Sequence, residues 1–267
     1  MMTRLVTLSL AAALAGSCGG TTGGAHVTFP AFAAGPVGAS GGPLEFTNFV
    51  GPGVPGYRVV LTRARLHIGA VYLKPTVQIL GAQATACYFA QPGFYTVEVL
   101  NSLDVDTLSP SLQAFRSDGY ATSTPVRSGE LWLTGGDINA IDDSTVILDV
   151  AGTADQAGVS YPFAGSLTIG RNRLVSSRDP GFPSLHPICK ERIVTPIPVD
   201  ITPQPGGTLT VRIDPREWFL GVDFKQLRSS GSPPRYQFAD AAGADPASDA
   251  LYRGIKSTVG VYQFTWQ

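Results

Sequence analysis

The stretch YRVVLTRARLHIGAVYL (residues 57–73) decides the fold class of this 267-residue chain. Arg63, Arg65 and His67 share one parity, and small or apolar residues from position 64 to position 70 share the other. A period of two residues places successive side chains on opposite faces of a β-strand. The stretch therefore predicts a strand region with one polar face and one apolar face.

Further strand patterns follow on both sides of turns that are rich in Gly and Pro. STVILDVAGTA (144–154) and YPFAGSLTIGRNRL (161–174) predict a hairpin across DQAGV. IVTPIPVDI (193–201) alternates, but its prolines predict an edge strand. Four other segments carry shorter strand patterns: FYTVEVL (94–100), GELWLTG (129–135), TLTVRIDP (208–215) and VGVYQFTW (259–266).

Helical patterns are few. One short helix is expected around residues 224–227, and ASDALYRGIKST (247–258) predicts another with Ser248 as its N-cap. Many short strands with few helices predict an all-β fold, an antiparallel β-sandwich of immunoglobulin-like or jelly-roll type with one or two short helices. No polar linker interrupts residues 25–267, so we expect one domain there.

The composition supports a packed domain and argues against a nucleic-acid partner. Hydrophobic residues make up 43% of the chain, charged residues make up only 15%, and the net charge is −1. A nucleic-acid partner would require a basic stripe, and no cluster of Lys and Arg longer than RAR occurs.

The N-terminus has the features of an export signal. One Arg precedes LVTLSLAAAL (5–14), which is too short to span a bilayer, and the small residues Ala15, Gly16 and Ser17 lead to Cys18. This order resembles the lipobox of bacterial lipoproteins, although Ala rather than Leu stands three positions before the cysteine. The resemblance implies a signal peptide over residues 1–17, lipidation of Cys18 and a tether over residues 18–24. Since Gly19 rather than Asp follows Cys18, it also implies the outer membrane of the cell envelope. An ordinary cleaved signal is the alternative.

Removal of Cys18 from the fold leaves one pair of cysteines. Cys87 and Cys189 would enter an oxidising compartment, where two thiols usually pair. We therefore expect a disulfide bond between Cys87 and Cys189, with two separate thiols as the alternative.

Two sets of side chains are candidate metal ligands. Copper could bind through the three histidines, and calcium could bind through the oxygens of a polar loop, which suit a cation that takes six to eight oxygen ligands. The histidines are His26, His67 and His186; the loop residues are Asp137, Asn139, Asp142 and Asp143. Each set has a simpler interpretation, because His67 shares its face with two arginines and Asp and Asn also favour turns.

The stretches RARLHIGAVYL (63–73) and PGFYTVEVLNSLDVD (92–106) are similar to a strand and a following Pro-Gly-x-Tyr step in the MbnP-like, methanobactin-associated copper-binding proteins. The resemblance covers about 50 residues, which include both of these stretches. It implies a secreted β-sandwich that binds copper. Asp104 and Val105 do not reproduce the full family pattern.

No catalytic or cofactor motif in the sequence rises above chance. No GxSxG, Walker-type or GxGxxG sequence supports hydrolase, nucleotide-binding or Rossmann chemistry. The carboxylates of Asp104 and Asp106 could serve a glycosidase but are more typical of a solvated strand face. The three tryptophans, at positions 132, 218 and 266, could form a sugar platform, but apolar neighbours of Trp132 and Trp218 favour core packing.

These observations together predict a lipid-anchored envelope lipoprotein. We expect it to act as a non-enzymatic binding protein or structural module without a cofactor, and its partner to be an envelope protein or a glycan. The alternative is a secreted β-sandwich that binds copper or calcium.

Overall fold

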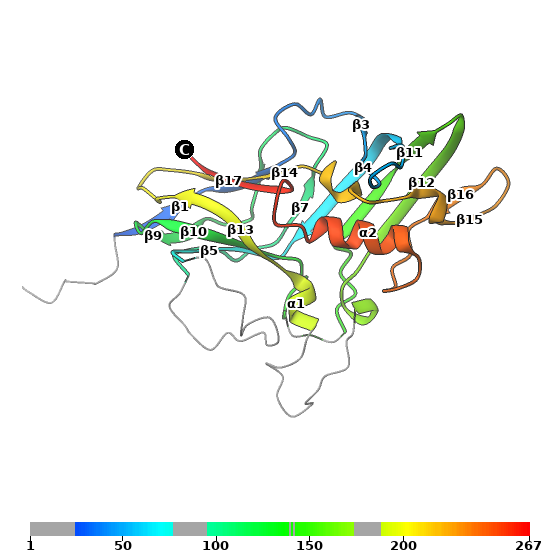
Figure 1. Ribbon diagram of the computed structural model, residues 1–267. Coiled ribbons are helices and arrows are strands. Elements are labelled where there is room, and N and C mark those ends of the chain that lie inside the picture. The colour runs from blue at the N-terminus through cyan, green and yellow to red at the C-terminus, as the bar shows by residue number, and fades with distance from the viewer. Residues whose placement is uncertain (1–24, 77–94, 139, 141, 174–187) are drawn as a thin grey trace, which may run out of the picture.

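The computed structural model describes residues 25–76, 95–138, 140, 142–173 and 188–267. Strands dominate these residues and form three sheets, in which nearly all neighbouring strands run antiparallel (Figure 1). The expectation of an all-β, sandwich-like fold is therefore confirmed.

The six-stranded sheet has the order β1-β9-β6-β5-β10-β13. Its strands are β1 (His26–Phe29), β9 (Gly119–Thr122), β6 (Val97–Val99), β5 (Ala70–Lys74), β10 (Val126–Trp132) and β13 (Ile193–Ile201). The proline-containing strand β13 lies at one edge, as the sequence predicts, because a proline there costs no ladder hydrogen bond on the open side.

The seven-stranded sheet has the order β15-β16-β12-β11-β4-β3, and β7 also pairs with β4. Its strands are β15 (Arg228–Ser230), β16 (Arg235–Gln237), β12 (Val159–Leu167), β11 (Leu148–Gln156), β4 (Arg58–Ile68), β3 (Leu44–Thr47) and β7 (Leu103–Asp106). The predicted hairpin is confirmed: β11 and β12 pair across Ala157 and Gly158, which both have positive φ. Two such residues form the tight turn that matches the twist of a hairpin.

The four-stranded sheet has the order β17-β14-β2-β8 and lies over one face of the six-stranded sheet (Figure 1). Its strands are β17 (Tyr262–Trp266), β14 (Leu209–Ile213), β2 (Ala31–Ala34) and β8 (Gln113–Ala114). The two sheets approach closely where Gly129 of β10 faces the ring of Phe264, since a Cβ at Gly129 would lie 2.5 Å from that ring.

The stretch 57–73 is not one strand but two. β4 ends at Ile68, β5 begins at Ala70, and the two strands belong to different sheets. The break falls at Gly69, where a Cβ would lie 2.1 Å from the carbonyl oxygen of Thr134, so only glycine allows the two backbones to approach so closely. Across this residue the fully buried positions change from even numbers, which end at Ile68, to odd numbers, which begin at Val71.

A β-bulge interrupts β4 before that break. Its register with β11 shifts between Ala151 and Gly152, and the buried parity of β4 changes from Leu61 to Ala64. A bulge adds one residue to one strand and so moves later side chains to the other face. The predicted apolar face is thus confirmed from Ala64 to Ile68 and ends there.

Two α-helices, α1 (Ile188–Arg192) and α2 (Pro246–Ile255), and three 3₁₀ turns complete the described residues. The turns are η1 (Arg171–Arg173), η3 (Glu217–Phe219) and η4 (Phe224–Gln226). The prediction of Ser248 as N-cap was wrong: Asp245 caps α2 by accepting a hydrogen bond from the Ser248 amide at 2.7 Å. Pro246 favours this earlier start, because proline is well suited to the first helical turn.

One cluster of buried side chains includes residues of all three sheets and of α2. Phe163 of β12 lies at an aromatic centre of this core, with ring centroids of Phe219, Phe224 and Phe238 within 4.9–5.7 Å. Within the described ranges, no helix combines the length and the apolar character needed to cross a bilayer.

Candidate binding site

Three aromatic side chains form a row on the face of the six-stranded sheet that points away from the core. Tyr72 lies between Tyr95 and Trp132, with ring centroids 4.3 Å and 4.6 Å away. All three side chains are half-buried. Because Val71 and Leu73 are fully buried, the alternation of β5 turns Tyr72 to the opposite face. We call these three residues the aromatic platform.

A buried ion pair holds the platform from one side. The Nζ of Lys74 donates to the Oε1 of Glu130 at 2.5 Å, and the two side chains are only 7% and 5% exposed. The Nε1 of Trp132 donates to the other oxygen of Glu130 at 3.4 Å. The Nζ of Lys74 lies 4.9 Å from the ring centroid of Tyr95, within the range of a cation–π contact. Lys74 and Glu130 therefore restrain two of the three rings.

The tyrosines of the platform remain neutral phenols at physiological pH. Burial raises the pKa of Tyr95 and of Tyr72, and the nearby carboxylates of Glu98 and Glu130 raise both further. A neutral ring can stack and donate a hydrogen bond but supplies no charge to a ligand.

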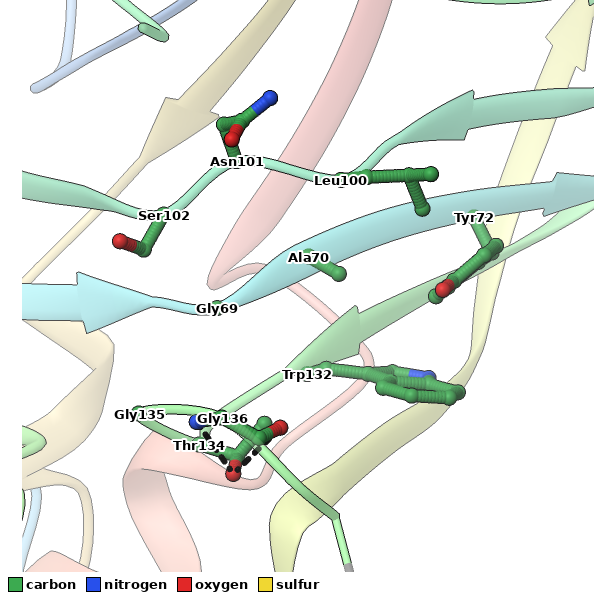
Figure 2. A pocket seen from close by; sticks show the side chains of 10 residues that line it. All are labelled: Gly69, Ala70, Tyr72, Leu100, Asn101, Ser102, Trp132, Thr134, Gly135 and Gly136. Atoms are coloured by element: carbon green, nitrogen blue, oxygen red, sulfur yellow. Dashed lines mark hydrogen bonds between the residues drawn. The ribbon is translucent and has the colours of Figure 1, made fainter.

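A pocket of about 260 Å³ opens beside the platform (Figure 2). Small residues form its floor, one wall is the segment that leads from β6 to β7, and the other wall is the end of β10 with the turn that follows. The lining residues are Gly69, Ala70, Tyr72, Leu100, Asn101, Ser102, Trp132, Thr134, Gly135 and Gly136. Figure 2 shows the Ala70 methyl group between the two walls and the Tyr72 and Trp132 rings beside each other at one end.

The lining of the pocket is uncharged and partly polar. The hydroxyl of Thr134 contacts the backbone of Gly136 and an oxygen of Asp143, and the amide of Asn101 donates to Ser117. The hydroxyl of Ser102 has no hydrogen-bond partner within the described part of the chain. The pocket therefore offers aromatic faces, hydroxyl and amide groups, and one hydroxyl that is available to a ligand.

The histidines predicted as metal ligands do not meet among the described residues. His26 lies exposed on β1, and His67 lies on β4 with its Nδ1 2.6 Å from the Oδ1 of Asp104. The Nε2 of His67 is buried and has no partner in the described ranges. His186 lies outside the described residues, so the copper hypothesis stays a prediction.

The predicted calcium loop is described in part. Asp143 accepts hydrogen bonds from the Thr145 and Gly135 amides and from the Thr134 hydroxyl. Burial alone would raise the pKa of Asp143, but these hydrogen bonds lower it below its usual value. Its oxygens thus fix the turn beside the pocket.

The other described residues of that loop do not form a cation site. Asp137 and Asp142 are described, whereas Asn139 is not. No group of three or more His, Cys, Asp or Glu side chains suited to a metal occurs among the described residues.

The remaining predicted positions separate into two groups. Cys18 and Cys87 lie outside the described residues, so the lipid anchor and the disulfide stay predictions; Cys189 is fully buried in α1. Trp218 is fully buried and Trp266 packs edge-on against Phe29, as core packing predicts. Trp132 is half-buried: it packs against the small buried cluster of Ile138 and Cys189, and it also lines the pocket.

Four residues of the site were not among the positions predicted from the sequence: Tyr72, Tyr95, Lys74 and Glu130. A signal existed for three of them: Tyr72 and Lys74 alternate with Val71 and Leu73, and Glu130 alternates with Leu131. The pairing of Glu130 with Tyr72 across β10 and β5 depends on register, which a single strand pattern does not contain.

Comparison with known proteins adds no relative to this description. No protein-family model, no curated protein and no solved structure matches the chain. The resemblances to lipoproteins and to MbnP-like copper proteins therefore rest on the residues quoted for them.

Proposed function

We propose that the chain is a lipid-anchored, non-enzymatic binding module of the bacterial cell envelope, and that its ligand binds in the pocket beside the aromatic platform. The observation that carries this proposal is the buried Lys74–Glu130 pair under half-exposed rings. A buried ion pair is costly to assemble unless further contacts compensate it. Rings held in place before a ligand arrives lose less entropy on binding, which favours a recognition surface.

The chemistry of the pocket supports binding rather than catalysis. Its lining contains no carboxylate, imidazole, thiol or amine, so no side chain there is suited to general acid–base work near neutral pH. Hydroxyl and aromatic groups can orient a ligand without transferring protons to it. No observation on the described residues favours copper or calcium over this proposal.

The anchor rests on the sequence around Cys18. Acyl chains contribute about 0.8 kcal/mol per buried CH₂ group, so two or more chains hold a folded domain at a bilayer. Metabolic labelling with an alkyne fatty acid tests this part. We expect label on the wild-type chain and none on Cys18→Ala; label on both chains would overturn the anchor.

The binding part is tested by saturation-transfer NMR with a mixed library of monosaccharides, short peptides, nucleotides and fatty acids. Ser102→Trp places an indole in the mouth of the pocket, and Ser160→Trp places one on the exposed part of β12 in another sheet. We expect at least one compound class to bind the wild type and Ser160→Trp but not Ser102→Trp. Equal signals from both variants, or no signal from any class, would refute binding in the pocket.

A further inference from the structure

We infer that the ligand of this pocket is a neutral saccharide, with one sugar ring in the pocket and its C–H face against Trp132 and Tyr72. The inference rests on the proposed binding function and names the ligand class for the same site. Four properties of the pocket lead to it: its size, its charge, its aromatic faces and its backbone opening.

The size suits a single small ring. The pocket holds about 260 Å³, whereas pockets for drug-sized ligands begin at about 300 Å³. Ala70 and Gly69 keep the floor low, so a flat ring can reach the sheet between the walls (Figure 2). A nucleotide or a long acyl chain would extend beyond this volume.

The charge excludes an anionic ligand. All ten lining residues are uncharged. The ionised groups beside the lining are Asp143, which accepts hydrogen bonds from Thr134 and Gly135, the Lys74–Glu130 pair, whose charges neutralise each other, and Glu98, which lies opposite Tyr72 in the ladder of β6 and β5. The uncompensated carboxylate of Glu98 would repel a phosphate, a uronic acid or a sialic acid.

The aromatic faces and the hydroxyl groups are complementary to a sugar. Aromatic rings carry negative faces that attract the weakly positive C–H groups of a pyranose, while the sugar hydroxyls need hydrogen-bond partners at the ring edge. Tyr72 and Trp132 supply the faces, and the hydroxyls of Ser102 and Thr134 lie in the walls. A purely apolar side chain of a peptide would leave the Ser102 hydroxyl without a partner, which costs free energy.

The backbone leaves room for the ring to enter. A Cβ added at Gly136, one of the lining residues, would meet no atom within 4 Å, so the turn after β10 is open at this residue. Glu130 acts here as a positioning residue, because it accepts from the Trp132 indole and so fixes the ring that the sugar would contact.

Titration with four neutral sugars tests the inference: methyl α-glucoside, methyl α-mannoside, methyl β-galactoside and N-acetylglucosamine, followed by NMR and by tryptophan fluorescence. Trp132→Ala removes the stacking face. Tyr120→Ala is the matched control, since Tyr120 is 62% exposed on the same sheet but outside the pocket. We expect at least one sugar to bind, with affinity reduced about 5- to 150-fold by Trp132→Ala and unchanged by Tyr120→Ala.

Two further measurements separate the possible failures. Glucuronic acid should bind more weakly than the neutral glucoside. Lys74→Met/Glu130→Leu, which removes the acceptor of the Trp132 indole without leaving an unpaired charge, should bind sugar more weakly than Lys74→Met/Glu130→Gln and should change the fluorescence of Trp132. If peptides or another class bind at the pocket and all four sugars do not, the saccharide inference is wrong while the binding function stands. If no class in the mixed library binds, both are wrong. Equal affinity of Trp132→Ala and the wild type for a bound sugar would also overturn the inference.

Discussion

Removal of one partner from the buried Lys74–Glu130 pair should destabilise the protein strongly. Lys74→Met keeps the length of the aliphatic chain but leaves Glu130 as an unpaired charge in a site where its side chain is 5% exposed. Breaking such a pair costs about 3–5 kcal/mol of the free energy of unfolding. For a domain of this size, the melting temperature should then fall by about 6–20 °C.

The matched control is an exposed ion pair on β10, the strand that carries Glu130. Arg127 of β10 pairs with Asp200 of β13, and the two side chains are 49% and 85% exposed. Because water screens an exposed pair, Arg127→Met should cost no more than about 1 kcal/mol. Urea unfolding of the wild type and both variants compares the two ion pairs directly.

A double variant provides the decisive test of the reasoning. Lys74→Met combined with Glu130→Gln removes both charges and keeps an acceptor for the indole of Trp132. It should be more stable than Lys74→Met alone, since no uncompensated charge remains. Two results would refute this explanation. One is that Lys74→Met costs as little free energy of unfolding as Arg127→Met. The other is that the double variant loses as much free energy of unfolding as Lys74→Met and Glu130→Gln lose together when each is measured alone.

Two other predictions concern stability. Gly69→Ala should cost at least about 1–3 kcal/mol, because the new Cβ would lie 2.1 Å from the Thr134 carbonyl oxygen, whereas Gly136→Ala should be close to neutral; thermal unfolding of both variants checks this, and equal melting temperatures would contradict it. Burial alone would raise the pKa of Asp223, but the hydrogen bond from the Tyr57 hydroxyl at 2.5 Å, with help from neighbouring residues, lowers it below its usual value. Because the pKa of this carboxyl is lower in the folded state, its ionised form stabilises the protein at pH values above the unfolded carboxyl pKa of about 3.9. This stabilisation is lost as the pH falls through the folded pKa. Tyr57→Phe should therefore cost about 1.5–3 kcal/mol at neutral pH and less in acid; a cost in urea unfolding that does not change with pH would argue against it.

Local patterns in the sequence predict several elements of the fold correctly. The hairpin of β11 and β12 follows from two alternating runs around a short turn, and the edge position of β13 follows from its prolines. These features depend on residues that are near one another in the chain, where turn chemistry and alternation act directly.

The division of residues 57–73 between two sheets does not follow from alternation. An apolar parity continues from Ile68 to Ala70, which favours one long strand, but the close approach of Thr134 to Gly69 separates the sheets. That approach depends on a segment more than sixty residues away in the chain, as the two residue numbers show. A single glycine in a strand pattern signals such an approach without identifying the partner.

The candidate site was missed for a similar reason. Trp132 has apolar neighbours, which favour the core, yet its own position on β10 alternates with the fully buried Leu131. The platform needs three segments in register, and the pairing of β5 with β10 is a tertiary property. Composition and spacing indicate the polar and apolar faces but do not show which faces come together.

The single residue between β4 and β5 also bears on how the protein opens. With no loop between them, the seven-stranded and six-stranded sheets share one continuous backbone, and neither can slide or unfold far without pulling on the other. Local opening events seen by amide hydrogen exchange should therefore be rare at this junction and approach the cost of global unfolding. Since Gly69 and Ala70 form the floor of the pocket, a ligand there would meet a surface that hardly deforms. Selectivity would then come from the shape of the ligand rather than from an adjustment of the protein.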